Sequence, residues 1–337
     1  MPHQTDGKEE VIYAVVDDGF RQMKCLTSGG HKDSFGSVAR TGFTLTGMGG
    51  QEDAGVGGYE TNSSKFTVDP ALDGEDTRFD DYALSEINRV LVQHALQRAG
   101  LSGRKVVLGT GLPFEVYFNG DNTVNQKLVD SKMANLAVEV KPLNGAASPT
   151  IVKQMVFAQG LAACIDRVTD DRGNYRHDFD RSVPIAVVDI GGRTTDTVVL
   201  LGGEKVDRSV SGTGNIGISN VYDRIVHGLR STFDVSNIRL GTIENAVRNG
   251  KIRFRGEEHD IREIIRSAVR EVGPQIIREV QRRIGDAAEM SEVLLVGGGA
   301  SLMSGVMRER YPHCVVPEEP EFANARGMLK FIQFSVE

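Results

Sequence analysis

Short runs of apolar and β-branched residues recur along the chain, each followed closely by glycine or aspartate. The clearest runs are residues 11–16, 106–108, 185–188 and 293–296. Runs of this length and composition predict buried β-strands that end in turns. Over residues 81–100 the apolar positions instead recur near the 3.6-residue period and stop at Gly100, which predicts a helix. The alternation of the two patterns indicates an α/β protein.

Two of these strands end in the same way. Residues 15–19 (Val-Val-Asp-Asp-Gly) and residues 187–191 (Val-Val-Asp-Ile-Gly) both place an aspartate and a glycine turn after an apolar strand. They lie at the heads of two roughly equal halves of the chain, which predicts a duplicated domain. No repeat with a period of about 20–50 residues is visible, which argues against a solenoid or propeller.

The other segments are less clearly patterned. Residues 29–74 are rich in Gly, Ser, Thr and Asp, which predicts a small, irregular β-rich subdomain. We further expect helices at 122–136 and 155–168, strands at 137–141 and 205–210, an exposed connection at 169–182 and a helix from about 218. Isoleucine and valine form an apolar stripe over 261–284, in which Pro274 is expected to bend or split the helix.

Charge argues against a broadly cationic nucleic-acid-binding protein. The chain has 337 residues, 39 basic and 46 acidic, and a formal net charge of −7. The arginines between 262 and 283 could form a DNA-binding face, but Glu263, Glu271 and Glu279 alternate with them. This pattern favours a solvated, salt-bridged surface.

The cysteines, the histidines and the hydropathy pattern bear on whether the protein has a metal site, a membrane span or a signal peptide. Cys25, Cys164 and Cys314 form no CxxC pair, and the histidines lack ligand spacing, so no protein-built metal cage is expected. No stretch approaches the roughly 20 apolar residues that span a bilayer. Residues 1–10 are polar and acidic, unlike a signal peptide. We therefore expect a cytoplasmic protein.

Glycine is unusually frequent, with 39 residues, and the glycine turns carry the candidate chemistry. Residues 189–196 (Asp-Ile-Gly-Gly-Arg-Thr-Thr-Asp) read as a strand followed by a glycine turn. Backbone N–H groups of such a turn approach a phosphate closely, and a carboxylate at the strand end can hold hydrated magnesium. Residues 17–24 add a carboxylate pair before a turn and Lys24 after it. Either alone could be an ordinary hairpin, but together they favour a facing phosphate clamp.

A literal GxGxxG occurs at residues 212–217 and alone would indicate a dinucleotide-binding fold. That fold requires a second apolar strand ending in an acidic residue about 20 positions later. Residues 231–237 are polar instead, so the dinucleotide interpretation is disfavoured.

With these motifs the sequence resembles the actin, Hsp70 and sugar-kinase ATPases, and most closely the bacterial plasmid-partition actins of the ParM (StbA) type. The resemblance extends from about residue 11 to 331. In that family the first phosphate loop corresponds to residues 17–24, the second to 189–196 and the adenosine loop to 297–300. Two more stretches are similar to the partition actins in particular, residues 111–113 and 325–328.

The resemblance implies a two-domain actin-like fold with duplicated ribonuclease-H-like cores and a nucleotide cleft between them. The first domain would cover residues 11–183, with its β-rich subdomain at about 29–80. The second would cover 184–320, with a helical subdomain at about 218–285. Residues 321–337 would form a C-terminal helix that packs back on the first domain.

The resemblance also implies the site. Asp17 and Asp189 would hold Mg²⁺ through water, and Gln159, in the helix expected from Phe157, would orient the attacking water. A helix N-terminal glutamine that only bonds backbone is the alternative. ATP or ADP, with GTP as a further possibility, would contact a larger set: Asp18, Gly19, Phe20, Arg21, Gln22, Lys24, Gly191, Gly192, Arg193, Thr194, Thr195, Asp196, Gly214, Asn215, Gly217, Gly297, Gly298, Gly299 and Ala300.

One departure from the family concerns the first loop. Partition actins often have small hydroxyl or glycine residues after the first-loop glycine, whereas this chain has Phe20, Arg21 and Gln22. A side-chain hydroxyl contact to phosphate is therefore not expected there. Backbone N–H groups and Lys24 remain as the donors.

By resemblance, the expected function is an ATPase that forms filaments and segregates plasmid DNA through a separate DNA-binding adaptor of ParR type. Neither direct nucleic-acid binding nor membrane attachment is expected. The main alternative is a non-filamentous sugar- or acetate-kinase-like phosphotransferase of the same superfamily. An Hsp70-type chaperone and a membrane-bound scaffold actin are weaker alternatives.

Overall fold

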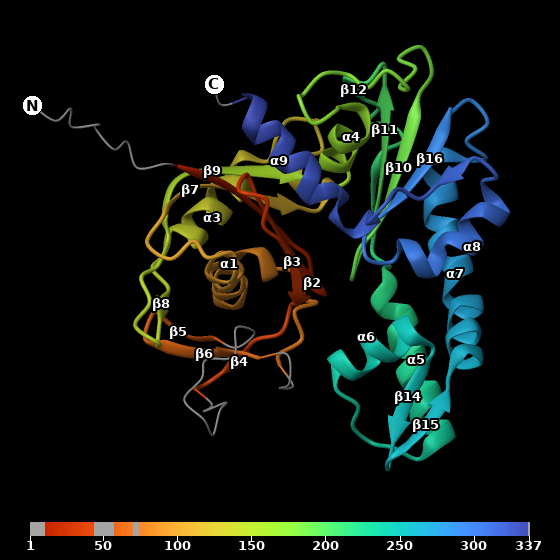
Figure 1. The fold of residues 1–337 in the computed structure, drawn as a ribbon. Coiled ribbons are helices and arrows are strands. Elements are labelled where there is room, and N and C mark those ends of the chain that lie inside the picture. The colour runs from red at the N-terminus through yellow and green to blue at the C-terminus, as the bar shows by residue number, and fades with distance from the viewer. Residues whose placement is uncertain (1–10, 44–56, 70–73, 336–337) are drawn as a thin grey trace, which may run out of the picture.

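The computed structural model describes residues 11–43, 57–69 and 74–335. The expectations for residues 1–10, 44–56, 70–73 and 336–337 lie outside this part of the chain. Two halves lie side by side, each built on a central sheet with helices packed against it (Figure 1). We call them the first half and the second half.

The sheet of the first half has five strands. Their order across the sheet is β3 (Lys32–Gly36), β2 (Gln22–Thr27), β1 (Ile12–Asp18), β7 (Lys105–Leu112) and β9 (Thr150–Ala158). The pairs among β1, β2 and β3 are antiparallel, whereas β7 is parallel to both β1 and β9. Ala14, Val15 and Val16 are fully buried, because helices cover both faces of the central strand.

The sheet of the second half repeats this plan. Its order is β12 (Lys205–Val206), β11 (Thr195–Leu201), β10 (Ile185–Ile190), β16 (Glu292–Val296) and β17 (Cys314–Val315), and β13 (Gly212–Gly214) also pairs with β11. Here too the first pairs are antiparallel and the last two are parallel. The shared order confirms the duplication predicted from the repeated strand endings.

Helices and the turns between them cover both sheets. The first half contains η1 (Tyr82–Leu84), α1 (Glu86–Arg98), α2 (Phe114–Tyr117), α3 (Gln126–Ala137) and α4 (Leu161–Val168). The second half contains α5 (Ile218–Phe233), α6 (Leu240–Asn249), α7 (Arg262–Ile284), α8 (Ala300–Arg310) and the hairpin of β14 (Lys251–Phe254) with β15 (Glu257–Asp260). Ser85 accepts the N–H of Asn88 and so caps α1.

The chain returns to the first half at its C-terminal end. After η2 (Pro320–Phe322), helix α9 (Ala323–Ser335) crosses α4 and packs on β1, β2 and β7 (Figure 1). Ala325, Met328 and Ile332 of α9 are buried against Val15 and Val107 of the sheet. The C-terminal helix thus packs on the sheet of the first half.

A small four-stranded sheet lies beside α1 at the edge of the first half. It consists of β4 (Arg40–Thr41), β6 (Ser64–Val68), β5 (Gly57–Thr61) and β8 (Lys141–Pro142). A β-rich subdomain was expected over residues 29–80, but Lys32–Gly36 belongs to the main sheet instead. Of the residues expected as a strand, 137–141, Ala137 ends α3 and only Lys141 lies in a strand, β8.

Two helix expectations are corrected. Residues 155–158 were expected to open a helix, but they end strand β9, and the helix begins only at Leu161. Apolar residues that satisfy a short helical window satisfy a buried strand equally well. Pro274 does not split α7, which continues through it from Arg262 to Ile284.

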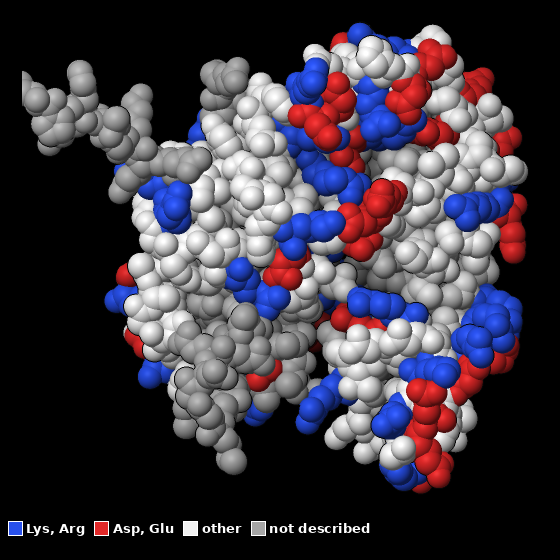
Figure 2. Space-filling view, in the orientation of Figure 1, with Lys and Arg blue, Asp and Glu red and all other residues white. Residues whose placement is uncertain are grey.

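The arginine-rich surface of α7 is salt-bridged. Arg262 pairs with Asp260, Arg266 and Arg270 pair with Glu263, and Arg282 pairs with Glu279. Figure 2 shows basic and acidic side chains interspersed on the face turned to the viewer. Among the described residues, no helix is both long enough and apolar enough to cross a membrane.

Candidate functional site

The two acid-tipped hairpins predicted from the sequence face each other. Asp17 lies opposite Lys24 in the β1–β2 pair, and Asp189 lies opposite Asp196 in the β10–β11 pair. A Cβ on Gly192 would lie 2.8 Å from the Cβ of Arg21, so the two turns are in contact. The duplicated hairpins thus meet at the boundary between the halves.

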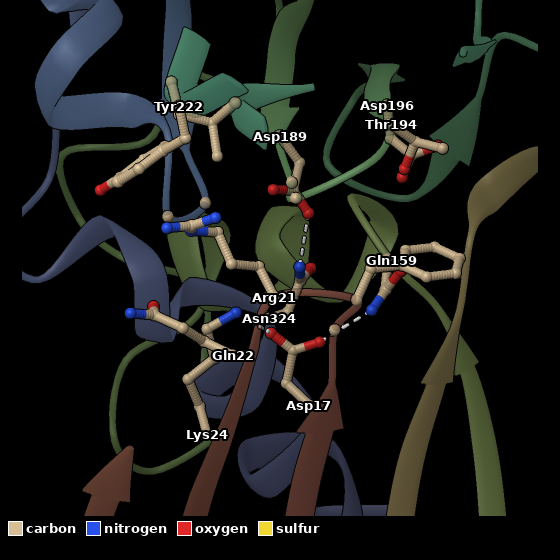
Figure 3. A pocket seen from close by; sticks show the side chains of 17 residues that line it. Asp17, Arg21, Gln22, Lys24, Gln159, Asp189, Thr194, Asp196, Tyr222 and Asn324 are labelled. Atoms are coloured by element: carbon tan, nitrogen blue, oxygen red, sulfur yellow. Dashed lines mark hydrogen bonds and ion pairs between the residues drawn. The ribbon is translucent and has the colours of Figure 1, made fainter. Parts of the chain in front are cut away.

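A hollow lies between these hairpins. Figure 3 shows the side chains of Asp17 and Lys24 entering it from one side, and Asp189 from the other. Most of the predicted site lines it: Asp17, Gly19, Phe20, Arg21, Gln22, Lys24, Gln159, Asp189, Gly191, Gly192, Thr194, Asp196, Gly297 and Gly298. Eight predicted residues do not: Asp18, Arg193, Thr195, Gly214, Asn215, Gly217, Gly299 and Ala300.

Asp17 is held by two donors, one from strand β2 and one from the turn after β9. Lys24 Nζ lies 3.3 Å from Asp17 Oδ2, and Gln159 Nε2 donates to Asp17 Oδ1 at 2.8 Å. Gln159 stands between the end of β9 and the start of α4, and its N–H donates to the carbonyl of Leu112. Gln159 therefore reaches the hollow from the turn after a strand. The sequence pattern had placed it inside a helix.

Asp189 is enclosed by its neighbours. Asn324 Nδ2 donates to Asp189 Oδ2 at 2.6 Å, and a Cβ on Gly297 would lie 2.2 Å from Asp189 Oδ1. Gly297 has φ +86°, so this position requires glycine for two reasons. Burial, and then the charge of Asp17, raises the pKa of Asp189 to about 6 against the opposing effects of Asn324 and Lys24.

Asp196 is the second carboxyl group at this end of the sheet. Its Oδ1 accepts from the N–H of Phe114 at 3.3 Å and from the hydroxyl of Thr213. Burial, and then the charge of Asp189, raises the pKa of Asp196 from 3.8 to about 8. The protonated form is therefore favoured in the folded protein at neutral pH.

This shift predicts how the Asp196→Asn variant depends on pH. Because the folded pKa is raised, the stability that protonated Asp196 contributes is complete below about pH 4 and is lost as pH rises through about 8. Asparagine stays neutral, so the stability of the variant relative to the wild type should rise between pH 5 and pH 8. Urea unfolding at both pH values measures this difference. An equal pH dependence for the two proteins would contradict the raised pKa.

Asp18 does not face the hollow, because neighbouring residues of a strand point to opposite faces. Its carboxylate is buried on the other side of β1, where Lys132 Nζ lies 2.5 Å and Asn88 Nδ2 lies 2.7 Å from Oδ2. Its Oδ1 accepts the N–H of Gly111 at 3.2 Å. The expectation that Asp18 contacts nucleotide is therefore wrong. Its carboxylate instead binds buried side chains and backbone behind the first loop.

The glycines at 214 and 217 pack against protein. A Cβ on Gly217 would lie 2.6 Å from the carbonyl oxygen of Gly192, and one on Gly214 would lie 3.0 Å from Glu279 Cγ. The N–H groups of Ile218 and Ser219 donate to the carbonyls of Gly191 and Gly192. The GxGxxG segment thus supports the second loop from behind.

Three residues that line the hollow were not predicted: Ile218, Tyr222 and Asn324. Tyr222 lies on α5, and the guanidinium carbon of Arg21 sits 3.5 Å from its ring centroid. Arg21 Nε also lies 3.3 Å from Glu244 Oε1 of α6. Arg21 of the first half therefore contacts two side chains of the second half, through an ion pair with Glu244 and a cation–π contact with Tyr222.

The comparisons with known proteins agree with this architecture. Residues 12–170 match the family model of the plasmid segregation protein ParM, N-terminal, and residues 187–309 match that of the archaeal actin homologue MreB-like, C-terminal. No curated protein matches the chain.

Several solved structures are similar over 96% of this chain. A non-polymerisable quadruple mutant of pCBH ParM is 19% identical with a TM-score of 0.76, and 99% of its chain is covered. The archaeal actin homologue Ta0583 is 18% identical with a TM-score of 0.76 over 99% of its chain, and its complex with ADP scores 0.75. A 15-stranded ParM filament from Clostridium botulinum is 19% identical with a TM-score of 0.75 over 99%. At these identities the likenesses establish the fold.

Proposed function

We propose that this chain, a member of the actin-like superfamily, binds ATP with Mg²⁺ between its two halves, hydrolyses it, and forms filaments. We further propose that the filaments segregate plasmid DNA in the cytoplasm through a DNA-binding adaptor. One observation carries the proposal. Asp17 and Asp189, on duplicated hairpins of opposite halves, face one hollow that Lys24 and Gln159 also enter.

The charges at the hollow suit a hydrated divalent cation. The charge of Asp17 raises the pKa of Asp189, so the two carboxylates lie close enough to repel each other. A cation between them would remove this repulsion. Mg²⁺ retains several waters and is commonly bound through one or two carboxylates plus substrate phosphates. Asp17 and Asp189 would hold it in this way, and the bound ion would neutralise charge on the transferred phosphoryl group.

The turns would bind the phosphates. Residues 19–22 of the first turn and Gly191, Gly192 and Thr194 of the second border the hollow beside Lys24. Successive backbone N–H groups in such turns form anion-binding sites. Lys24 already pairs with Asp17, so it can move between the carboxylate and a phosphate over a short distance.

Gln159 would orient water. Its amide lies at the boundary of the hollow and is held by Asp17 Oδ1. An amide is not a base at neutral pH, but phosphoryl transfer chiefly requires placement of the nucleophile and compensation of charge. Gln159 can orient an attacking water by accepting one of its hydrogens.

Filament formation follows from how nucleotide would act on the two halves. ATP and ADP make different contacts across the hollow, so each would favour a different angle between the halves. Surfaces that span both halves would then fit a neighbouring copy better in one nucleotide state. The fold shared with the ParM filament supports this part of the proposal.

The proposal is tested by sedimentation and negative-stain microscopy of the purified chain with Mg²⁺ and ATP, GTP, ADP or no nucleotide. We expect filaments with a triphosphate and phosphate release that follows assembly. Turnover only after addition of a sugar or acetate would instead support the phosphotransferase. An absence of nucleotide binding would refute both.

Gln159→Ala should slow phosphate release by roughly tenfold to a hundredfold, because the attacking water would lose its placement. Filaments should still form with ATP and should last longer. Gln154→Ala is the matched control, since Gln154 lies on β9, the strand that Gln159 follows, and donates to the carbonyl of Met133. Unchanged phosphate release in Gln159→Ala would remove Gln159 from the mechanism.

A further inference from the structure

The side-chain amide of Asn324 joins the two halves beside the hollow. Asn324 lies in the first turn of α9 and is 4% exposed. Its Nδ2 donates to Asp189 Oδ2 at 2.6 Å, and its Oδ1 accepts the N–H of Gly160 at 2.9 Å. Figure 3 shows this amide directed at Asp189, on the opposite side of the hollow from Lys24. One side chain therefore connects Asp189 to the residue that follows Gln159.

The two partners require an amide at this position. A backbone N–H offers only a donor and an ionised carboxylate offers only acceptors. Asparagine has one acceptor and one donor group on the same short side chain, so it satisfies both. An aspartate would retain the bond to Gly160 and oppose Asp189 with a second charge. An alanine would leave both partners unpaired.

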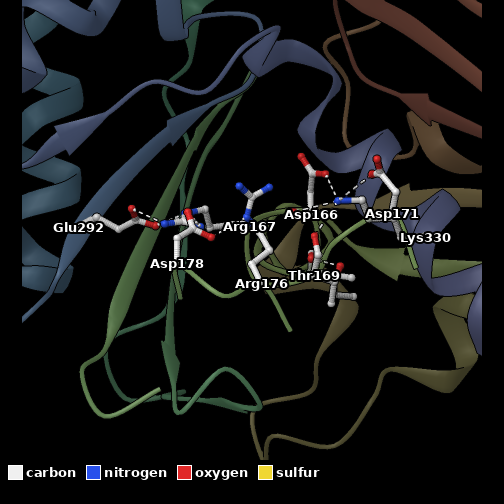
Figure 4. Close-up of polar contacts among 9 residues, drawn as sticks. Asp166, Arg167, Thr169, Asp171, Arg176, Asp178, Glu292 and Lys330 are labelled. Carbon is white, nitrogen blue, oxygen red and sulfur yellow. Dashed lines mark hydrogen bonds and ion pairs between the residues drawn. The ribbon is translucent and has the colours of Figure 1, made fainter. Parts of the chain in front are cut away.

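Asn324 is fixed to the first half by the packing of α9 on α4. A Cβ on Gly327 would lie 1.7 Å from the carbonyl oxygen of Ala162, so the helices cross with their backbones nearly in contact. Arg326 and Lys330 both pair with Asp166 of α4, at 2.8 and 3.0 Å. Figure 4 shows Lys330 beside Asp166 and Asp171 at the end of α4.

Asp189 belongs to the second half, because β10 lies in the middle of its sheet. The bond from Asn324 to Asp189 therefore crosses the boundary between the halves, whereas the bond to Gly160 stays within the first half. Rotation of the halves would lengthen the first bond and preserve the second. Both ends are buried, so separation would leave polar groups unpaired, which proteins strongly avoid.

We propose that Asn324 is a positioning residue that couples the angle between the halves to the placement of Asp189 and of the Gln159–Gly160 turn. This inference rests on the proposed ATPase function. Asn324 would keep Asp189 in place for the metal only while the halves are closed. Opening would then withdraw the metal-binding carboxylate from the Gln159 side of the hollow, so hydrolysis would depend on closure.

The test compares Asn324→Ala with the wild type in four measurements on the full chain. We expect saturated phosphate release to fall by about tenfold to a hundredfold, and binding of a fluorescent ATP analogue to change by less than about threefold. The Mg²⁺ concentration for half-maximal turnover should rise. Small-angle X-ray scattering, at protein concentrations too low for filaments to form, should lose the difference between the ATP and ADP states that we expect for the wild type.

Asn135→Ala is the matched control. Asn135 lies on α3, away from the hollow, and donates from Nδ2 to the carbonyl of Ser85 at 3.1 Å. The Asn135→Ala variant removes a hydrogen bond between a side-chain amide and the backbone, as Asn324→Ala does. It therefore reports the effect of lost stability without a change at the hollow. Asn324→Ser, with a hydroxyl too short to satisfy both partners, is the second variant in case Asn324→Ala does not fold.

The outcomes are distinct. A turnover and Mg²⁺ requirement within about twofold of the wild type in Asn324→Ala would overturn the inference and leave the ATPase intact. So would a reduction that Asn135→Ala reproduces at equal stability, or failure of both Asn324 variants to fold, because the role would then be structural. A wild type that neither binds nor hydrolyses nucleotide would overturn the inference together with the proposed function.

Discussion

Lys132→Met should lower the free energy of unfolding by about 3–5 kcal/mol, because it would leave the carboxylate of Asp18 charged and buried. Lys132 is fully buried, and its Nζ lies 2.5 Å from Asp18 Oδ2 and 2.8 Å from the carbonyl of Gly111. Methionine has nearly the same length and shape but no donor. Urea unfolding followed by circular dichroism measures the loss.

Two further variants separate a buried charge from a lost contact. Adding Asp18→Asn to Lys132→Met removes the unpaired charge, so the double variant should regain a large part of the stability. Lys141→Met is the exposed control, since its pair with Glu139 is 64% and 71% exposed, and we expect a change within about 0.5 kcal/mol. A loss in Lys132→Met no larger than that in Lys141→Met would contradict the argument.

The same cluster affects the site indirectly. Asp18 accepts the N–H of Gly111, so the Asp18–Lys132 pair ties the end of β1 to the end of β7. Asp17 is the next residue along β1 and faces the hollow. Loss of the pair should therefore also loosen the first loop.

Local patterns were sufficient to predict the hairpins. Asp17 and Asp189 each follow an apolar run and precede glycines, and this arrangement lies within a few consecutive residues. The duplication was visible for the same reason. The hairpins face each other because of the tertiary fold, which local patterns do not specify. From the sequence, this arrangement was predicted through the family resemblance.

The alternation of side chains along a strand could have corrected one prediction. Asp17 and Asp18 were both assigned to the nucleotide site, but adjacent strand residues point to opposite faces. Only Asp17 enters the hollow. Residues 155–158 were ambiguous at the same level, since their pairing with β7 as a strand depends on contacts far away in the chain.

Asn324 and Tyr222 could not be recognised from local pattern. Asn324 immediately precedes residues 325–328, which resemble the partition actins, but no motif within this sequence marks its side chain as polar and buried. Tyr222 lies one helical turn after Ile218, on the helix that follows the GxGxxG segment. Both reach the hollow because α5 and α9, which are far apart in the sequence, begin beside it.

Gly327→Ala should destabilise the protein by about 3 kcal/mol, because small-to-large changes in close packing cost about 1–3 kcal/mol and sometimes more. Its Cβ would lie 1.7 Å from the carbonyl oxygen of Ala162 and 2.6 Å from the carbonyl carbon. These are backbone atoms of α4, so no side chain can rotate away. Thermal unfolding should show a Tm lower by roughly 4 °C.

Gly305→Ala is the matched control, since it makes the same change on helix α8 with nothing within 4 Å of the new Cβ. Alanine is the better helix former by about 1 kcal/mol, so this variant should be as stable as the wild type or more so. If Gly327→Ala and Gly305→Ala were equally stable, this would contradict the close approach of α9 and α4 at Gly327.

Because α9 also carries Asn324, separation of α9 from α4 should move the Asn324 amide away from Gly160. Gly327→Ala should therefore lower phosphate release as well as stability, whereas Gly305→Ala should change neither adversely.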